Sequence, residues 1–231
     1  MHSTAKRPRR RRLTSRSLLL LVTLSLFIAR DAPARSLARA RIATETPLAD
    51  ALRETRVTSW ATSLEPILVT NASTGATARI GLYDGGGEID DGARASFERV
   101  ASRENESHRL TLRVEQLVFK AAYHFGVQRL LVVSGWREHA GRHSTGEALD
   151  FRLPGIRPAI VAAYLRGLPR VGVGVYTDPR TQFVHVDVRD ASYSWIDGSP
   201  PGVHWQERPM GGGGTAKRDA AYVPEMDLPY P

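Results

Sequence analysis

The sequence predicts an α+β fold with a small, largely antiparallel sheet that is flanked by helices. Runs of residues that favour strands come in adjacent pairs as well as separated by helices, which is typical of a sheet with antiparallel neighbours and not of a doubly wound one. The 231 residues suffice for one domain after a leader and a tail are subtracted. No internal repeat is visible.

Residues 1–34 have the three parts of a secretory leader. The basic run RPRRRR precedes an apolar stretch over 18–29, and the small residues Ala-Pro-Ala follow over 32–34. Eight basic residues against one acidic residue give this segment +7 of the formal charge of +8. The rest of the chain is almost neutral, which argues against a nucleic-acid binder. We therefore expect an exported protein of the periplasm or cell envelope, held at the membrane only through the leader if the leader is not cleaved.

A linker rich in Ala, Arg and Thr is expected over 35–64, and the folded domain is expected over 65–205. The first predicted element of the domain is a hairpin. Strand-favouring runs over 67–70 and 78–83 enclose the turn residues 71–75.

Apolar residues at helical spacing predict a helix over 110–125, and Gly126 follows where helices commonly end. A second helix is expected over 156–168, with Pro158 in its first turn. Four further segments are predicted to be strands. They cover 129–134, 148–152, 171–175 and 182–189.

The segment over 206–231 is predicted to be a disordered tail. It contains a run of four glycines and a largely polar remainder, a composition that buries too little apolar area to offset the loss of conformational entropy. The chain has no cysteine. Any metal ion must therefore be held by imidazole and carboxylate groups.

Two strand segments carry the residue types of a metal site. In HSTGEALD, His143 lies in a turn, and alternation along the following strand places Asp150 on the face opposite the core. In FVHVDVR, the valines take the core face while His185 and Asp187 share the open face. Two imidazoles and one carboxylate leave a fourth tetrahedral position for water, as in catalytic zinc sites. The alternative is a strand with one ordinary solvated face.

These motifs resemble the family of zinc D-alanyl-D-alanine carboxypeptidases and murein endopeptidases. Their order is SGWR, which ends at Arg137, then HSTGEALD, then GVGVY over 172–176, then FVHVDVR, with Trp195 after it. The segment LVTNASTGATARI over 68–80 resembles the N-terminal hairpin of the exported bacterial branch. The similarity spans roughly 65–195. It implies a fold like those of the hedgehog and D,D-peptidase proteins.

The resemblance also implies roles for individual residues. Arg137 is expected to bind or polarise the peptide substrate, because a guanidinium pairs with a terminal carboxylate or a developing oxyanion. The alternative for Arg137 is a surface ion pair with a neighbouring glutamate. The implied zinc ligands are His143, Asp150 and His185.

The sequence departs from the better-known carboxypeptidases at Gln182, where they have a carboxylate three residues before the last His ligand. An amide does not act as a general base, so that role must fall elsewhere. Asp187 is the first choice, because it projects from the same strand face as His185 and reaches the metal-held water or orients the imidazole. The other candidates are Glu138 and His139.

We expect an exported zinc metallopeptidase that hydrolyses peptide bonds in peptidoglycan stem peptides or cross-links, as a murein endopeptidase or a carboxypeptidase. The alternative is a non-catalytic module that holds zinc and binds peptidoglycan, and the missing carboxylate at Gln182 favours it. The expected cofactor is Zn²⁺. The expected partner is peptidoglycan, with a monomeric chain and no nucleic acid.

Overall fold

The computed structural model describes residues 60–102, 108–138, 141–200, 203, 206–211 and 213–229. The expected leader over 1–34 and most of the expected linker lie outside this part of the chain. The described residues belong to one compact unit, which extends over 46–231. None of the helices in the described part is both long and apolar enough to cross a bilayer.

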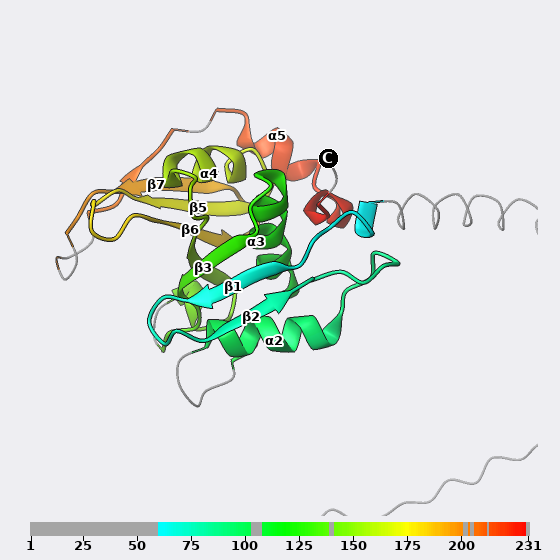
Figure 1. Ribbon diagram of the computed structural model, residues 1–231. Helices are drawn as coiled ribbons and strands as arrows, with labels where there is room; N and C mark the ends of the chain where they lie inside the picture. The colour runs from blue at the N-terminus through cyan, green and yellow to red at the C-terminus, as the bar shows by residue number, and fades with distance from the viewer. Residues whose placement is uncertain are drawn as a thin grey trace, which may run out of the picture. The chain divides into compact units, whose positions relative to one another are not determined.

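The centre of the fold is a mixed sheet of eight strands within the described residues (Figure 1). Their order across the sheet is β2-β1-β3-β4-β6-β5-β7-β8. The strands are β1 (Ile67–Asn71), β2 (Thr77–Ile80), β3 (Arg129–Ser134), β4 (Ala148–Arg152), β5 (Val171–Tyr176), β6 (Phe183–Val188), β7 (Tyr193–Asp197) and β8 (Arg208–Pro209).

Parallel and antiparallel neighbours both occur in this sheet. The strand β1 runs parallel to β3, and β5 runs parallel to β7. The other neighbouring strands pair in antiparallel orientation. The α+β class is therefore confirmed, while the sheet has more strands than the sequence predicts, because β7 and β8 were not predicted.

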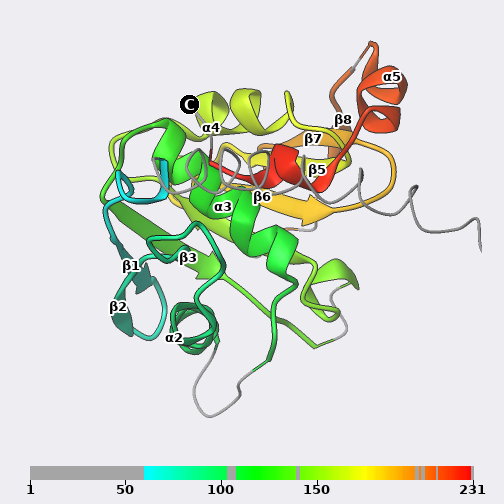
Figure 2. The ribbon, with the colours of Figure 1, turned by 90° about the vertical axis from the view of Figure 1, so that its right-hand side faces the viewer.

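Three helices lie against one face of the sheet (Figure 2). The rings of Phe97 in α2 (Asp91–Ala101) and Phe119 in α3 (Leu112–His124) are 5.3 Å apart. The ring of His124 stacks at 3.9 Å on Tyr164 of α4 (Pro158–Leu165). These contacts join the three helices into one layer, so the side chains on the other sheet face are left for a site.

The predicted local elements agree well with the observed ones. The predicted hairpin is formed by β1 and β2, whose antiparallel register pairs Val69 with Ala78. The predicted helices over 110–125 and 156–168 correspond to α3 and α4, with Pro158 as the first residue of α4. The four later predicted strands correspond to β3, β4, β5 and β6. The helix α2 was not predicted.

The predicted disorder of the C-terminal segment is wrong for its described residues. This segment forms β8, α5 (Thr215–Ala220) and the 3-10 turn η2 (Pro224–Asp227). Asp219 accepts hydrogen bonds from the backbone N–H groups of Arg170 and Ser192. Asp227 forms an ion pair of 2.8 Å with Arg113 of α3. Buried polar contacts, which a composition argument cannot see, therefore hold the segment on the domain.

The end of the expected linker is also part of the fold. Trp60 and Ala61 are buried, at 8% and 5% exposure. The indole of Trp60 packs edge-on against the ring of Tyr83, with centroids 5.2 Å apart. The folded unit therefore begins at or before Trp60 rather than at Glu65.

A buried carboxylate lies between α2 and α3. Glu115 is fully buried, and its Oε2 accepts a hydrogen bond of 2.7 Å from Arg94 Nε. Its Oε1 has no hydrogen-bond partner in the described part of the chain. Burial raises the pKa of Glu115 to about 7, and the ion pair with Arg94 offsets only part of that effect.

This carboxylate predicts a pH-dependent stability. Because folding raises the pKa of Glu115, its contribution to stability is fully present below about pH 4.5 and is lost as the pH rises to about 7. The free energy of unfolding should decrease over that window by up to about 3 kcal/mol. In Glu115→Gln this decrease should be absent, whereas the exposed-site control Glu88→Gln should retain it. Urea denaturation at several pH values measures the difference, and equal slopes in all three proteins would contradict the prediction.

Candidate metal centre

A row of residues crosses four neighbouring strands on the face of the sheet opposite the three helices. Asp150 in β4 pairs with His185 in β6, and His185 pairs with Gly174 in β5. Gly174 in turn pairs with Trp195 in β7. The register therefore brings a carboxylate, an imidazole and an indole to one line across the sheet.

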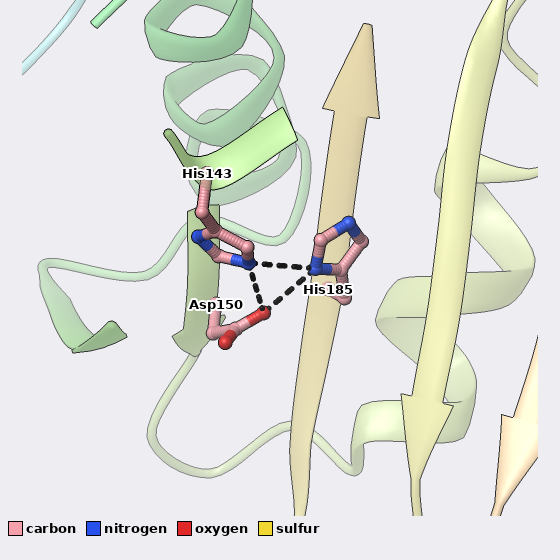
Figure 3. A group of neighbouring side chains, drawn as sticks. All are labelled: His143, Asp150 and His185. Carbon is pink, nitrogen blue, oxygen red and sulfur yellow. Dashed lines mark hydrogen bonds and ion pairs between the residues drawn. The ribbon is translucent and has the colours of Figure 1, made fainter. Parts of the chain in front are cut away.

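His143 reaches the same place from a turn that precedes β4. It ends the short 3-10 helix η1 (Gly141–His143), and Gly146 then takes a positive φ of 73° as the chain reverses. The Nδ1–H of His143 donates a hydrogen bond of 2.6 Å to the carbonyl oxygen of Gly135. With the proton on Nδ1, the lone pair on Nε2 points toward Asp150 and His185 (Figure 3).

The three side chains meet in a small triangle. His143 Nε2 is 3.2 Å from His185 Nδ1 and 3.5 Å from Asp150 Oδ1. His185 Nδ1 is 2.8 Å from Asp150 Oδ1. All three residues are buried, at 3% to 7% exposure. These three residues are a group that could hold a metal ion.

Outer hydrogen bonds orient the ligand-type side chains. The Nε2–H of His185 donates a hydrogen bond of 3.1 Å to Asp187 Oδ2, which leaves the lone pair of Nδ1 for the triangle. Asp150 turns Oδ1 toward the imidazoles, while Oδ2 accepts a hydrogen bond of 3.2 Å from Arg137. When both imidazoles are neutral, two lone pairs and one carboxylate oxygen point at one another, an arrangement that is unfavourable unless a positive charge lies between them.

The pKa shifts of Asp150 and His185 also indicate that the site favours a positive charge. Burial opposes ionisation of Asp150, but the neighbouring imidazoles outweigh burial and hold its pKa below its usual range. Burial alone would lower the pKa of His185, but Asp150 and Asp187 raise it to about 9. The cluster therefore favours a proton on His185 beside Asp150, and the same three residues could hold a metal ion in place of that proton.

Asp187 lies on the far side of the His185 ring from the triangle. It is 1% exposed and forms an ion pair with Arg189 in addition to its hydrogen bond with His185. The predicted open face is therefore wrong at this position, because Arg189 and the neighbouring strands cover the carboxylate. The geometry suits a residue that orients the imidazole, which was one of its two predicted roles.

Two glycines of β5 make room for this arrangement. A Cβ on Gly172 would collide with the carboxylate of Asp187 and with Arg189. A Cβ on Gly174 would lie 2.6 Å from two ring atoms of Trp195. The glycines of the GVGVY motif therefore let side chains of the neighbouring strands lie across β5.

A pocket of about 270 Å³ opens beside the triangle. Three aromatic side chains form part of its wall, and Tyr176 stacks on Phe183 with centroids 4.2 Å apart. Burial, together with nearby carboxylates, raises the pKa of Tyr176, so its hydroxyl remains a donor. The lining residues are Arg137, His143, Asp150, Tyr176, Phe183, His185, Trp195 and Glu207.

Sequence reasoning missed Glu207 as a residue of this pocket. It immediately precedes β8, in the segment that the sequence predicts to be disordered. Its Oε1 accepts a hydrogen bond of 3.3 Å from the hydroxyl of Tyr176. No local pattern in the sequence signals this contact, because it depends on the pairing of β8 with β7.

The other candidate residues have different placements. Gln182 is exposed and does not line the pocket. Glu138 is described but does not line the pocket either, and His139 lies outside the described residues. Arg137 contacts Asp150 rather than a surface glutamate, and its side chain is 32% exposed.

No family of known proteins, no curated protein and no solved structure matches the chain. What the site does must therefore follow from its own geometry and chemistry.

The fit of Trp195 over β5 predicts the effect of one added methyl group. In Gly174→Ala the indole must move, and this ring packs against His185 with centroids 5.1 Å apart. We expect a loss of about 1–3 kcal/mol in the free energy of unfolding and weaker metal binding. The control Gly211→Ala adds a methyl group to a site with no atom within 4 Å. Chemical denaturation compares the two variants, and equal stabilities would count against the proposed fit.

The contact between Asp187 and His185 predicts a second effect. Asp187→Asn weakens the hold on the imidazole and should lower metal affinity about 10–100-fold, as is usual for such outer partners. The exposed Asp190→Asn is the matched control and should bind metal as the wild type does. Competition with a chelating dye measures both affinities. Unchanged affinity in Asp187→Asn would show that the contact does not orient the ligand.

Proposed function

We propose that this protein is an exported zinc metallopeptidase that hydrolyses peptide bonds in peptidoglycan stem peptides or cross-links. The observation that carries the proposal is the convergence of two imidazole lone pairs and one carboxylate oxygen beside a pocket. The order of the sequence motifs around these residues resembles that of the zinc D-alanyl-D-alanine carboxypeptidases and murein endopeptidases. The mixed sheet, in which antiparallel pairs predominate, is compatible with a D,D-peptidase-like fold.

The triangle has dimensions that suit zinc. Tetrahedral ligands about 2.0–2.2 Å from an ion are roughly 3.3 Å from one another. The three separations here are 2.8, 3.2 and 3.5 Å. The donor set of His143, Asp150 and His185 is one that zinc accepts in catalytic sites, with one position left open. A zinc ion at this place would polarise an amide carbonyl and lower the pKa of a water molecule.

Each proposed ligand also has an outer partner, as functional metal sites usually do. The carbonyl oxygen of Gly135 fixes His143, and Asp187 fixes His185. Arg137 fixes the second oxygen of Asp150. These contacts set the orientation of both imidazole rings before any ion binds, so little movement of the side chains is needed.

The pocket supplies groups that suit a peptide substrate. Arg137 lines it and brings a positive charge that would pair with a substrate carboxylate or stabilise the oxyanion of amide hydrolysis. Tyr176, Phe183 and Trp195 add apolar surface against which a peptide or sugar would pack. The secretory pattern of residues 1–34 would deliver the protein to the cell envelope, where peptidoglycan lies.

A second candidate function is a non-catalytic module that holds zinc and binds peptidoglycan. The position of Gln182 favours it, because this residue offers no carboxylate and does not line the pocket. Binding of the protein to isolated sacculi without any release of fragments would support this candidate.

The test of the proposed enzyme is digestion of isolated sacculi. The zinc-loaded protein should release muropeptide fragments, identified by mass spectrometry, and a chelator should abolish the release. His185→Ala should be inactive because the site loses one of its ligands, while the exposed His124→Ala should remain active. Cleavage that is indifferent to the chelator, or no cleavage after zinc repletion, would rule the proposal out.

A further inference from the structure

Hydrolysis of an amide needs a group that takes a proton from water and gives one to the leaving nitrogen. The acidic residues closest to the triangle already have other partners. Asp150 faces two imidazoles and Arg137. Asp187 is buried behind His185 with both oxygens bonded to Arg189. Asp150 lines the pocket, but both of its oxygens are engaged by the imidazoles and Arg137, and both oxygens of Asp187 are engaged by Arg189.

We propose that Glu207 is the proton-accepting catalytic residue of this site. The inference rests on the function proposed above and adds a residue that the sequence motifs do not contain. Among the residues that line the pocket in the described part of the chain, Asp150 and Glu207 are the carboxylates. Glu207 is exposed to solvent, so water reaches it.

The backbone around Glu207 holds it at the rim of the pocket. The next two residues form β8, in which Arg208 pairs with Ile196 and Pro209 with Trp195. The N–H of Met210 donates a hydrogen bond of 2.8 Å to the carbonyl oxygen of Ser194. The sheet thus positions Glu207 against the same strand that presents Trp195 to His185.

A chain of hydrogen bonds orients the carboxylate. The Nε1–H of Trp195 lies 3.4 Å from the hydroxyl oxygen of Tyr176 and donates to it. The hydroxyl of Tyr176 then donates to Glu207 Oε1 at 3.3 Å. Because Tyr176 occupies Oε1, the second oxygen of Glu207 is the one available to a water molecule. Tyr176 is accordingly a positioning residue.

The chemical step balances without any further reactant. As the water oxygen forms a bond to the amide carbon, one of its protons passes to the carboxylate of Glu207. The carbon–nitrogen bond then breaks, and the protonated Glu207 returns that proton to the leaving nitrogen. The products are a carboxylic acid and an amine, the acid proton then passes to the amine to give a carboxylate and an ammonium group, and Glu207 ends in the ionised form in which it began.

The test compares Glu207→Gln with the wild type on soluble cross-linked muropeptides, using the zinc-loaded protein. The amide keeps the size of the side chain but takes no proton, so kcat should fall about 100-fold or more. KM, bound zinc per chain, the thermal midpoint and the Kd for intact muropeptide should stay at wild-type values. The matched control is Glu225→Gln, an exposed glutamate of η2, which should behave as the wild type.

Any other result contradicts the inference, and the kind of result shows which part of it is wrong. A wild-type kcat in Glu207→Gln means that the proton goes elsewhere. A raised KM with an unchanged kcat means that Glu207 binds a substrate ammonium group instead. If the wild-type protein itself shows no chelator-sensitive cleavage, the proposed function fails first and the role of Glu207 fails with it.

The variant Tyr176→Phe tests whether Tyr176 only positions the carboxylate of Glu207 and takes no part in proton transfer. Loss of one hydrogen bond to the carboxylate should lower kcat about tenfold, less than the loss in Glu207→Gln. Zinc content should not change, since Tyr176 is not a proposed ligand. The double variant should be no slower than Glu207→Gln alone, because Tyr176 acts through that carboxylate. Additive losses would contradict this dependence.

Discussion

The need of the buried His-Asp-His triangle for a positive charge is the constraint on which the rest of the structure depends. The outer hydrogen bonds direct His143 Nε2 and His185 Nδ1 toward Asp150 Oδ1, across at most 3.5 Å. Side chains would not hold this arrangement in a buried place unless their surroundings enforced it. The fold enforces it through the register of β4 with β6 and through the turn that carries His143. A positive charge among the three atoms satisfies the arrangement.

The glycines of β5 show how the sheet accommodates such a site. Strands usually present side chains to both faces, and here one face of β5 is bare at Gly172 and Gly174. The side chains of β6 and β7 lie in that space, so Asp187 supports His185 from one side while Trp195 packs on it from another. Ordering the two glycines costs more backbone entropy than ordering other residues would. In return, the space they leave lets Asp187 and Trp195 hold the imidazole of His185 in place.

Much of the fold was predictable because its signals are local. Helical spacing predicted α3 and α4, and short apolar or alternating runs predicted strands β3 to β6. Alternation along β4 and β6 placed Asp150 and His185 on one face. Burial of that face was not predictable, because it depends on the ion pair of Arg189 with Asp187 and on the packing of Trp195 against His185. The C-terminal segment was misjudged for the same reason. Its order comes from contacts such as Arg113 with Asp227, between residues far apart in the chain.

The residues that line the pocket come from both sides of β7 in the sequence. All three side chains of the triangle precede β7, whereas Glu207 follows it and is held in place by β8. The three proposed ligands are therefore synthesised before the residue that completes the wall of the pocket. A chain that ended after β7 would contain all three of them and would lack Glu207. The complete pocket thus requires the pairing of β8 with β7.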